Sequence, residues 1–251
     1  MIFRTRSNLV RQVFFAIVVC GFFANFAVAQ EPDPRELLNR MSNEVANLQQ
    51  FTISGDAYAD ARLDAGLILE QTTQATMRVS KPNSVRITNR TAEDLKELYF
   101  KSNELTIYTR SKNFYGQVQF PEGTTNGLDY AVGELGIDVP MMDFVTGDVA
   151  KRMLANATEV IYLGKSLVRD SIYEQVAIRT PEIDVQIWIA TEGPPLPGKM
   201  SLSAKWDGGS PRTVIFMEWD TAPDFPDDIF DFEPPDGAQK IAFETRSDSE
   251  E

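Results

Sequence analysis

The 251-residue chain contains no histidine, and its only cysteine is Cys20. Without histidine, the chain lacks the usual general base for a serine nucleophile and the commonest metal ligand. A single cysteine excludes an internal disulfide and a site built from several thiolates. These absences exclude most hydrolase triads and zinc centres, and we therefore expect neither a cofactor nor a metal site.

The chain also lacks a G-x-G-x-x-G motif and a Walker loop, so no phosphate-cradling turn is indicated. Its 37 acidic residues outnumber 24 basic ones and give a net charge of −13. Such a surface disfavours nucleic acid as a partner and favours solubility. No pair of carboxylates stands out as an acid and base, so we expect a protein that is not an enzyme. A carboxylate-based hydrolase remains the least favoured alternative.

The acidic residues are dense in the proline-rich stretch 223–236, where hard oxygen ligands would suit calcium. Their spacing does not follow the EF-hand pattern, and prolines are typical of turns. The sequence therefore favours solvated turns over a calcium site in this stretch.

The N-terminus has the order of a secretion signal. Arg4, Arg6 and Arg11 precede the apolar run 13–24, and the small-residue site Ala27-Val28-Ala29 follows. We expect residues 1–29 to be a signal peptide that is cleaved near Ala29, which places the protein in the periplasm. A membrane anchor is the alternative, but the apolar run is short for a spanning helix.

Cys20 raises a second alternative, a lipoprotein signal in which the mature chain begins at a lipidated cysteine. Ile17 and Val19 stand where such signals have small residues, and apolar residues continue after Cys20. We therefore favour cleavage near Ala29. The remaining residues 30–251 suit a single domain with a core at about 33–243 and a flexible tail at 244–251.

A helix is expected at the start of this domain. Asp33 precedes Pro34, and Glu36 follows three residues after Asp33, which is a helix-start pattern. Leu37, Met41, Val45 and Leu48 continue at helical spacing. The pattern predicts one amphipathic helix that ends near residue 50.

The period then changes to two. Residues 51–120 predict about six strands, and residues 160–221 predict five more. Consecutive strands without intervening helices favour an antiparallel meander. Between them, residues 124–157 lose the alternation and predict two or three short helices. The fold class is therefore α+β, mainly β, with about eleven strands.

Several strands carry large apolar side chains on both faces, as in Val185, Ile187 and Ile189 against Trp188. Either both faces are covered, or a cavity lies on one of them. Flexible methionines suit a surface that adapts to an apolar ligand. Ordinary core packing is the alternative, and it is the more common role of such residues. The methionines in question are at positions 141, 142, 153, 200 and 217.

Several phrases together resemble the LolA/LolB superfamily of periplasmic lipoprotein carriers, in particular its branch of predicted periplasmic proteins. They are the opening helix 37–48 that leads into Phe51, the Lys-Pro-Asn-Ser-Val-Arg segment at 81–86, Tyr-Thr-Arg at 108–110, Val-Gln-Ile-Trp-Ile at 185–189 with Leu-Pro at 196–197, and Phe-Asp-Phe-Glu-Pro-Pro-Asp-Gly-Ala at 230–238.

The resemblance implies a curved antiparallel half-barrel, with the N-terminal helix and short lid helices over its concave face. It also implies a soluble, monomeric carrier or chaperone for acyl chains of lipids or lipoproteins, with an envelope membrane protein as a further partner. We expect the cavity to be lined by Leu128, Tyr130, Leu135, Met141, Met142, Phe144, Trp188 and Met200. An envelope sensor or interaction module with a filled cavity is the alternative function.

Overall fold

The structure is a computed structural model that describes residues 31–63, 66–120, 127, 130, 131, 133, 135, 141, 143–205 and 211–242. Its contacts divide the chain into Met1–Glu31 and Pro32–Glu251, and only the second unit is described below. The expected signal peptide and the tail 244–251 lie outside the described residues. No helix in the described part has both the length and the apolar character needed to cross a membrane.

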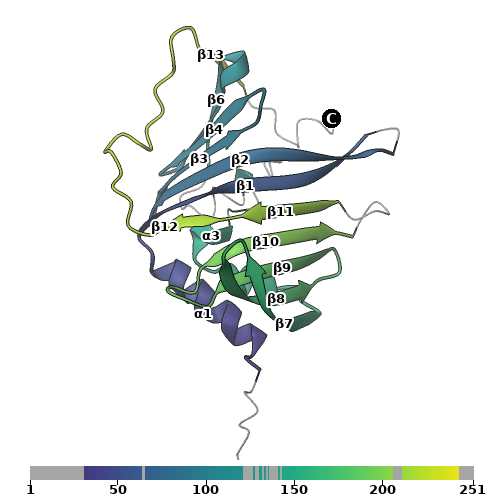
Figure 1. Cartoon of the computed structure of the whole chain (residues 1–251). Helices are drawn as coiled ribbons and strands as arrows, with labels where there is room; N and C mark the ends of the chain where they lie inside the picture. The colour runs from purple at the N-terminus through teal and green to yellow at the C-terminus, as the bar shows by residue number, and fades with distance from the viewer. Residues whose placement is uncertain are drawn as a thin grey trace, which may run out of the picture. The chain divides into compact units, whose positions relative to one another are not determined.

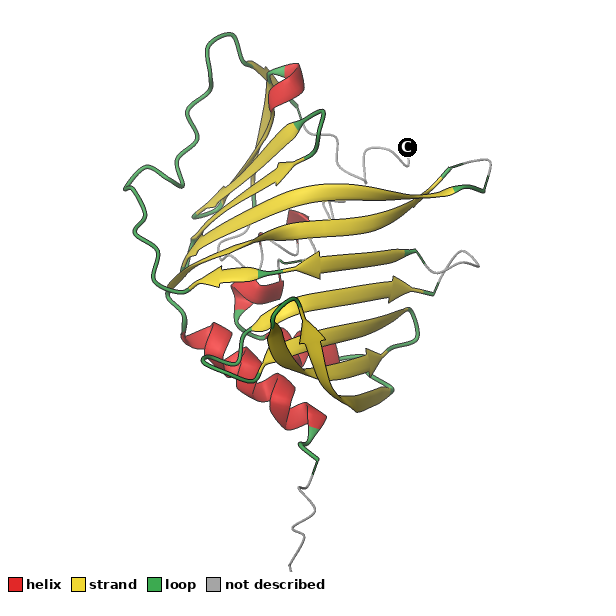
Figure 2. Ribbon diagram, viewed as in Figure 1, coloured by secondary structure: helices red, strands yellow, loops and turns green. Residues whose placement is uncertain are grey.

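One open, curved sheet of thirteen strands forms the body of the second unit (Figures 1 and 2). Its order is β13-β6-β5-β4-β3-β2-β1-β11-β10-β9-β8-β7, and β12 also pairs with β1. The strands are β1 (Gln50–Arg62), β2 (Ile68–Ser80), β3 (Ser84–Arg90), β4 (Leu95–Lys101), β5 (Glu104–Thr109), β6 (Phe114–Gln119), β7 (Glu159–Val168), β8 (Ser171–Arg179), β9 (Ile183–Ala190), β10 (Pro197–Ala204), β11 (Arg212–Phe216), β12 (Glu218–Asp220) and β13 (Gln239–Ile241).

The pairing is antiparallel throughout, except that β13 runs parallel to β6. The described part also contains a 3-10 turn, η1 (Arg110–Lys112), and the helices α1 (Pro34–Asn47), α3 (Asp143–Thr146) and α4 (Val149–Leu154). The prediction of a mainly β, antiparallel, curved and unclosed sheet is therefore confirmed.

Helix α1 begins where the sequence indicates. The side chain of Asp33 accepts a hydrogen bond from the amide of Arg35 at 2.8 Å, and Pro34 occupies the first turn. The buried side of α1 includes Leu38, Met41 and Val45. The helix ends at Asn47, slightly before the expected residue 50, because Leu48 already has extended backbone angles.

The core lies between one face of the sheet and the helices. Along β1, Phe51 and Ile53 are buried, and their neighbours across the ladder are Val79 and Met77 of β2. These residues form one apolar cluster with the buried side of α1 and with Phe144 of α3. We call this the inner face, and the opposite face, which carries the alternate residues of each strand, the outer face.

The strand expected near residues 213–221 is broken at Met217. β11 pairs with residues 57–59 of β1, whereas β12 pairs with residues 52–54. Between the two, a Cβ atom on Gly55 would lie 1.7 Å from the carbonyl oxygen of Phe216. The Met217 amide instead donates to the Gly198 carbonyl at 2.9 Å. This close approach of backbones divides the expected strand into β11 and β12. With the short β13 as a second addition, thirteen strands form where about eleven were expected.

The C-terminal segment after β12 returns to the far end of the sheet as an extended strap (Figure 1). Phe232 packs its ring against Tyr99, Tyr108 and Tyr115 on the outer face, with centroids 5.2 to 5.7 Å apart. The carboxylates of the strap are exposed, as turn chemistry predicts. Among the described residues, no group of three acidic, histidine or cysteine side chains is arranged to hold a metal ion.

Candidate ligand-binding site

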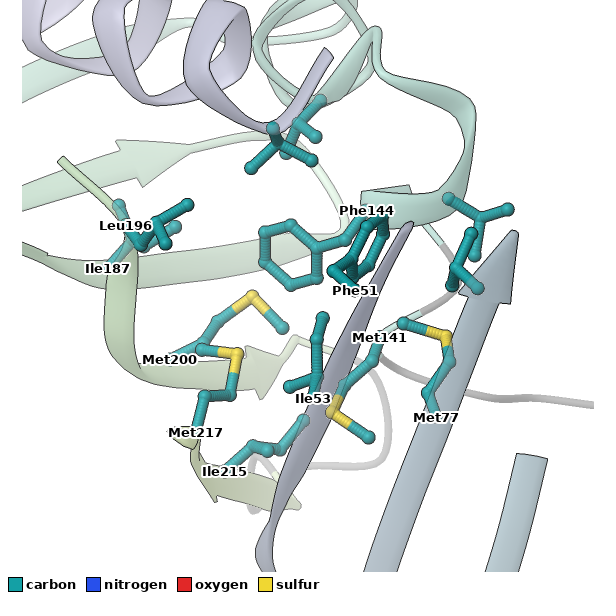
Figure 3. Packing of buried hydrophobic residues seen from close by; sticks show 14 of the residues in the cluster. Phe51, Ile53, Met77, Met141, Phe144, Ile187, Leu196, Met200, Ile215 and Met217 are labelled. Atoms are coloured by element: carbon teal, nitrogen blue, oxygen red, sulfur yellow. The ribbon is translucent and has the colours of Figure 1, made fainter. Parts of the chain in front are cut away.

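The candidate site is the layer between the inner face and the helices (Figure 3). Four methionines come together there from separate parts of the chain. Met77 lies on β2, Met200 on β10 and Met217 between β11 and β12, whereas Met141 comes from the segment before α3. Each of the four is at most 5% exposed. In Figure 3 the methionines lie on either side of Ile53, next to Phe51 and Phe144, so the interior is apolar and rich in unbranched, adaptable side chains.

Aromatic contacts join the lid segment to the sheet. The ring of Phe144 meets Trp219 edge-on at 5.7 Å, and Trp219 also packs at 5.5 Å against Phe51. The indole nitrogen of Trp219 donates to the Pro197 carbonyl at 2.8 Å, which fixes the ring orientation. Phe144 is therefore seated on a rigid aromatic platform supplied by β1 and β12.

Lys81 joins α1 to the sheet. Its ammonium group donates to the carbonyls of Val45 at 2.8 Å and Ala46 at 3.1 Å, and it lies 5.6 Å from the ring centre of Phe51. The last carbonyls of a helix have no partner within the helix, and the last turn of α1 has no basic residue. Lys81 meets this need from the turn after β2, and burial lowers the pKa of its ammonium group.

Ser42 joins α1 to the lid segment. Its hydroxyl donates to the Gly147 carbonyl and accepts from the Ala150 amide, both at 3.2 Å. The hydroxyl therefore satisfies backbone groups on both sides of the turn between α3 and α4. Helix α1 also contacts α4 and β7 directly. The inner face is thus covered by helices that a few polar contacts hold in place.

The structure brings together five of the eight residues expected to line a cavity. Met141, Phe144 and Met200 are buried in the interior, and Tyr130 and Leu135 are partly buried against it. Leu128 and Met142 lie outside the described residues.

Trp188 does not join the other expected lining residues. It alternates with Ile187 and Ile189 and therefore lies on the outer face, where the Lys199 ammonium group sits 4.4 Å from its ring centre. Trp188 is buried at 5% exposure by these outer-face contacts. Because successive strand residues point to opposite faces, the sequence alone predicts that Trp188 lies on the face opposite Ile187 and Ile189.

Lys81 is the residue of this region that the sequence pattern does not single out. The available signal is indirect, because a helix without a basic last turn needs a donor from elsewhere, and the Lys-Pro-Asn turn offers one. Lys81 and Val45 lie more than thirty residues apart in the sequence, so their contact could not be predicted without the structure.

Three hollows lined by described residues open away from this interior. The largest, of about 760 Å³, has a mainly polar lining that includes Thr72, Gln74, Arg90 and Arg110. The others, of about 460 and 280 Å³, lie at the end of α1 and beside Phe216. None of these three hollows is lined by Met77, Met141, Phe144, Met200 or Met217.

Comparisons with known proteins give one family match. The model of the family described as "Predicted periplasmic protein (DUF2092)" matches residues 35–244. This range contains the segments 81–86 and 230–238 that carry the sequence resemblance, and the part of the resemblance that concerns a family of predicted periplasmic proteins is therefore confirmed. None of the curated proteins matches the sequence significantly.

Solved structures with a similar chain path are more distant. The lipoprotein LppX of Mycobacterium tuberculosis is 8% identical, with 76% of this chain and 97% of that chain covered and a TM-score of 0.47. LprF of Mycobacterium bovis is 13% identical, with 78% and 96% covered and a TM-score of 0.47. A LolA superfamily protein of Nitrosomonas europaea is 13% identical, with 80% and 98% covered and a TM-score of 0.37. These likenesses say nothing about what this chain binds.

Proposed function

This chain belongs to the family of predicted periplasmic proteins DUF2092, and we propose that it binds acyl chains or a similar apolar ligand between the inner face and the helices. The binding is non-covalent, and the protein acts as a carrier or chaperone in the periplasm after its signal peptide is removed. Its partners are lipids or the acyl chains of lipoproteins, which an envelope membrane protein loads or receives.

This proposal rests on the residues that cover the inner face. Met141 and Phe144 occupy the centre of the interior, yet they belong to the segment between β6 and β7 and not to the sheet. An apolar ligand that takes their place would find Met77, Met200 and Met217 on the sheet side. These flexible thioethers adapt to a chain of variable shape at low cost.

The energetics of such an exchange are favourable in magnitude. Each buried CH₂ group contributes about 0.8 kcal/mol, so about ten groups would contribute roughly 8 kcal/mol. The exposure of Phe144 costs about 3 kcal/mol of that gain, and the ordering of the ligand costs more. A net binding energy therefore remains for a long acyl chain but not for a short one.

The proposal is tested by the uptake of a fluorescent long-chain fatty acid, together with native mass spectrometry of gently purified protein. We expect the native protein to take up the probe. The variant Phe144→Ala should bind it roughly a hundredfold more tightly, because the ligand no longer has to displace the ring and about 3 kcal/mol corresponds to about two orders of magnitude in affinity. The control variant Phe225→Ala removes a ring that packs on Phe230 in the strap, and it should bind as the native protein does.

A native protein that is recovered without ligand and takes up no probe would contradict the proposal, provided that Phe144→Ala also takes up none. Far-ultraviolet circular dichroism of each variant checks that the sheet is retained. The uptake is measured with the protein recovered from the periplasm, so that it has passed through export.

The packed interior favours a second candidate function, a sensor or interaction module that has kept the fold but binds no ligand. The ring contacts of Phe144 and the near-complete burial of four methionines are the observations that support it. Under this alternative, Phe144→Ala lowers the unfolding free energy by about 3 to 5 kcal/mol without producing any uptake. The same two variants therefore separate the two functions.

A further inference from the structure

The hairpin of β1 and β2 extends beyond the strands beside it (Figures 1 and 2). β11 pairs with β1 only as far as Ala59, and β3 pairs with β2 only from Gln74. The last three pairs of the hairpin, from Asp60–Glu70 to Arg62–Ile68, have no further strand beside them among the described residues. A two-stranded ribbon alone is marginally stable in water, so this projection is costly to keep.

The end of this ribbon is apolar. Leu63, Leu67, Ile68 and Leu69 are 48%, 55%, 49% and 43% exposed, respectively. We call these four residues the hairpin tip. The amide of Leu63 donates to the carbonyl of Leu67 at 2.9 Å, and Gly66 occupies a left-handed conformation with φ of +79°. Hydrogen bonds therefore join the described ends of this turn, whereas its residues Asp64 and Ala65 lie outside the described part of the chain.

The tip is apolar on both faces of the ribbon. Ile68 and Leu69 follow each other in β2, so their side chains point to opposite faces, yet both are nearly half exposed. A protein partner would cover one face of so narrow a ribbon. An apolar liquid such as the acyl layer of a membrane surrounds it on every side. The two-faced exposure therefore fits lipid better than a protein groove.

The charges behind the tip restrict the kind of lipid. Asp60 and Glu70 stand opposite each other in the ladder behind the apolar residues, and the exposed Arg62 stands opposite Ile68. The two carboxylates outnumber the one guanidinium group, so the net negative charge at this position would be repelled by an anionic headgroup layer. We propose that the hairpin tip inserts into the surface of a zwitterionic lipid layer and so positions the protein at a membrane. This contact does not involve the interior and stands even if the interior binds no ligand.

The dimensions agree with shallow insertion. From the turn at Leu67 to Leu69, the ribbon advances about 7 Å at 3.4 Å per residue. Interfacial elements bury their apolar residues about 5 to 10 Å into the boundary between headgroups and acyl chains. The acidic pair Asp60–Glu70 then remains at the level of the headgroups, in contact with water.

The first test is flotation with phosphatidylcholine vesicles, using protein recovered from the periplasm. We expect the native protein to float with the vesicles at low and at high salt, because apolar contact is not screened. The double variant Leu67→Ser with Ile68→Ser should lose about tenfold in the bound fraction. The matched control is Leu167→Ser on β7, where the native leucine is 70% exposed. It should float like the native protein.

A second measurement covers the case in which the double variant disturbs the hairpin. Ile68→Cys is made in a Cys20→Ser background, so that the new thiol is unique, and is labelled with a polarity-sensitive dye. Addition of vesicles should shift its emission to the blue, whereas the dye on Leu167→Cys should not shift.

Three outcomes would overturn the proposal. The native protein could remain unbound, binding could appear only with anionic lipid, or the Leu167 variants could respond as the tip variants do. Absence of a dye shift at position 68 would likewise refute insertion into lipid.

Discussion

Tyr99 shows how single residues on the outer face are held. Its hydroxyl donates to Glu97 at 3.3 Å, the Arg86 guanidinium lies 4.8 Å from its ring centre, and Phe232 of the strap packs at 5.4 Å. Burial, and after it the negative charge of Glu97, raise the pKa of Tyr99 to about 12. The neutral phenol is therefore the form that the folded protein stabilises.

A loss of stability at alkaline pH follows from this raised pKa. The unfolded tyrosine has a pKa of about 10, so the contribution of Tyr99 is complete below pH 10 and is lost as the pH rises through about 12. Urea unfolding between pH 9 and 12 should show a decline that is shallower in Tyr99→Phe. A spectrophotometric titration should show one late-ionising tyrosine that is absent from this variant. Identical pH profiles for the two proteins would contradict the assignment.

The residues of the candidate site were only partly accessible to prediction. Strict alternation separates Trp188 from Ile187 and Ile189, so its place on the outer face follows from the pattern alone. The gathering of Met77, Met141 and Met200 does not, because it depends on which distant strands become neighbours. An apolar side chain in the sequence has the same appearance whether it fills a core or lines a pocket.

At the scale of elements, the attachment of α1 rests on Lys81. Replacement by methionine keeps the length of the side chain but removes the donors to Val45 and Ala46. We expect Lys81→Met to lower the unfolding free energy by about 1 kcal/mol, because the partly buried carbonyl of Val45 and the exposed carbonyl of Ala46 lose a charged donor. Urea denaturation measures this loss, and hydrogen exchange should show faster exchange in α1.

Lys96→Met is the matched control for this change. Lys96 is exposed on β4, and its replacement should alter stability by less than about 0.5 kcal/mol. An equal effect of the two lysine variants would show that Lys81 does not secure the helix.

Prediction of the elements succeeded where local chemistry decides. The start of α1 follows from Asp33 and Pro34, and most strands follow from alternation. The break between β11 and β12 depends instead on the approach of Phe216 to Gly55, two residues far apart in the sequence. The parallel pairing of β13 depends likewise on a strap that crosses the sheet. Such long-range contacts leave no periodic signal in the residues that make them.

At the scale of the whole sheet, the two edges are protected differently. At one edge, β13 pairs with β6 and covers part of it. At the other, β7 has a register shift between Tyr162 and Gly164, and Gly164 has a φ of +88°. Such an irregularity disfavours the addition of a further strand. An open sheet must block edge pairing in this way, since exposed ladders join to one another.

Removal of β13 should therefore make the protein self-associate. A chain that ends at Asp236 keeps the Phe232 contact but leaves the hydrogen-bonding groups of β6 unpaired. Sedimentation velocity should show larger species that increase with concentration. The control chain ends at Ala242, retains β13 and should sediment like the full-length protein. Equal sedimentation of the two truncated chains would show that β13 does not protect this edge.

The methionine-rich interior also affects how long the protein survives chemically. Oxidation converts a thioether into a polar sulfoxide, which no longer suits an apolar core. Met77, Met141, Met200 and Met217 are shielded only while the helices lie over the inner face. Under the proposed function, an opening that admits a ligand therefore also admits oxidants. The rate at which these sulfur atoms are oxidised would therefore report how often the helices move away from the inner face.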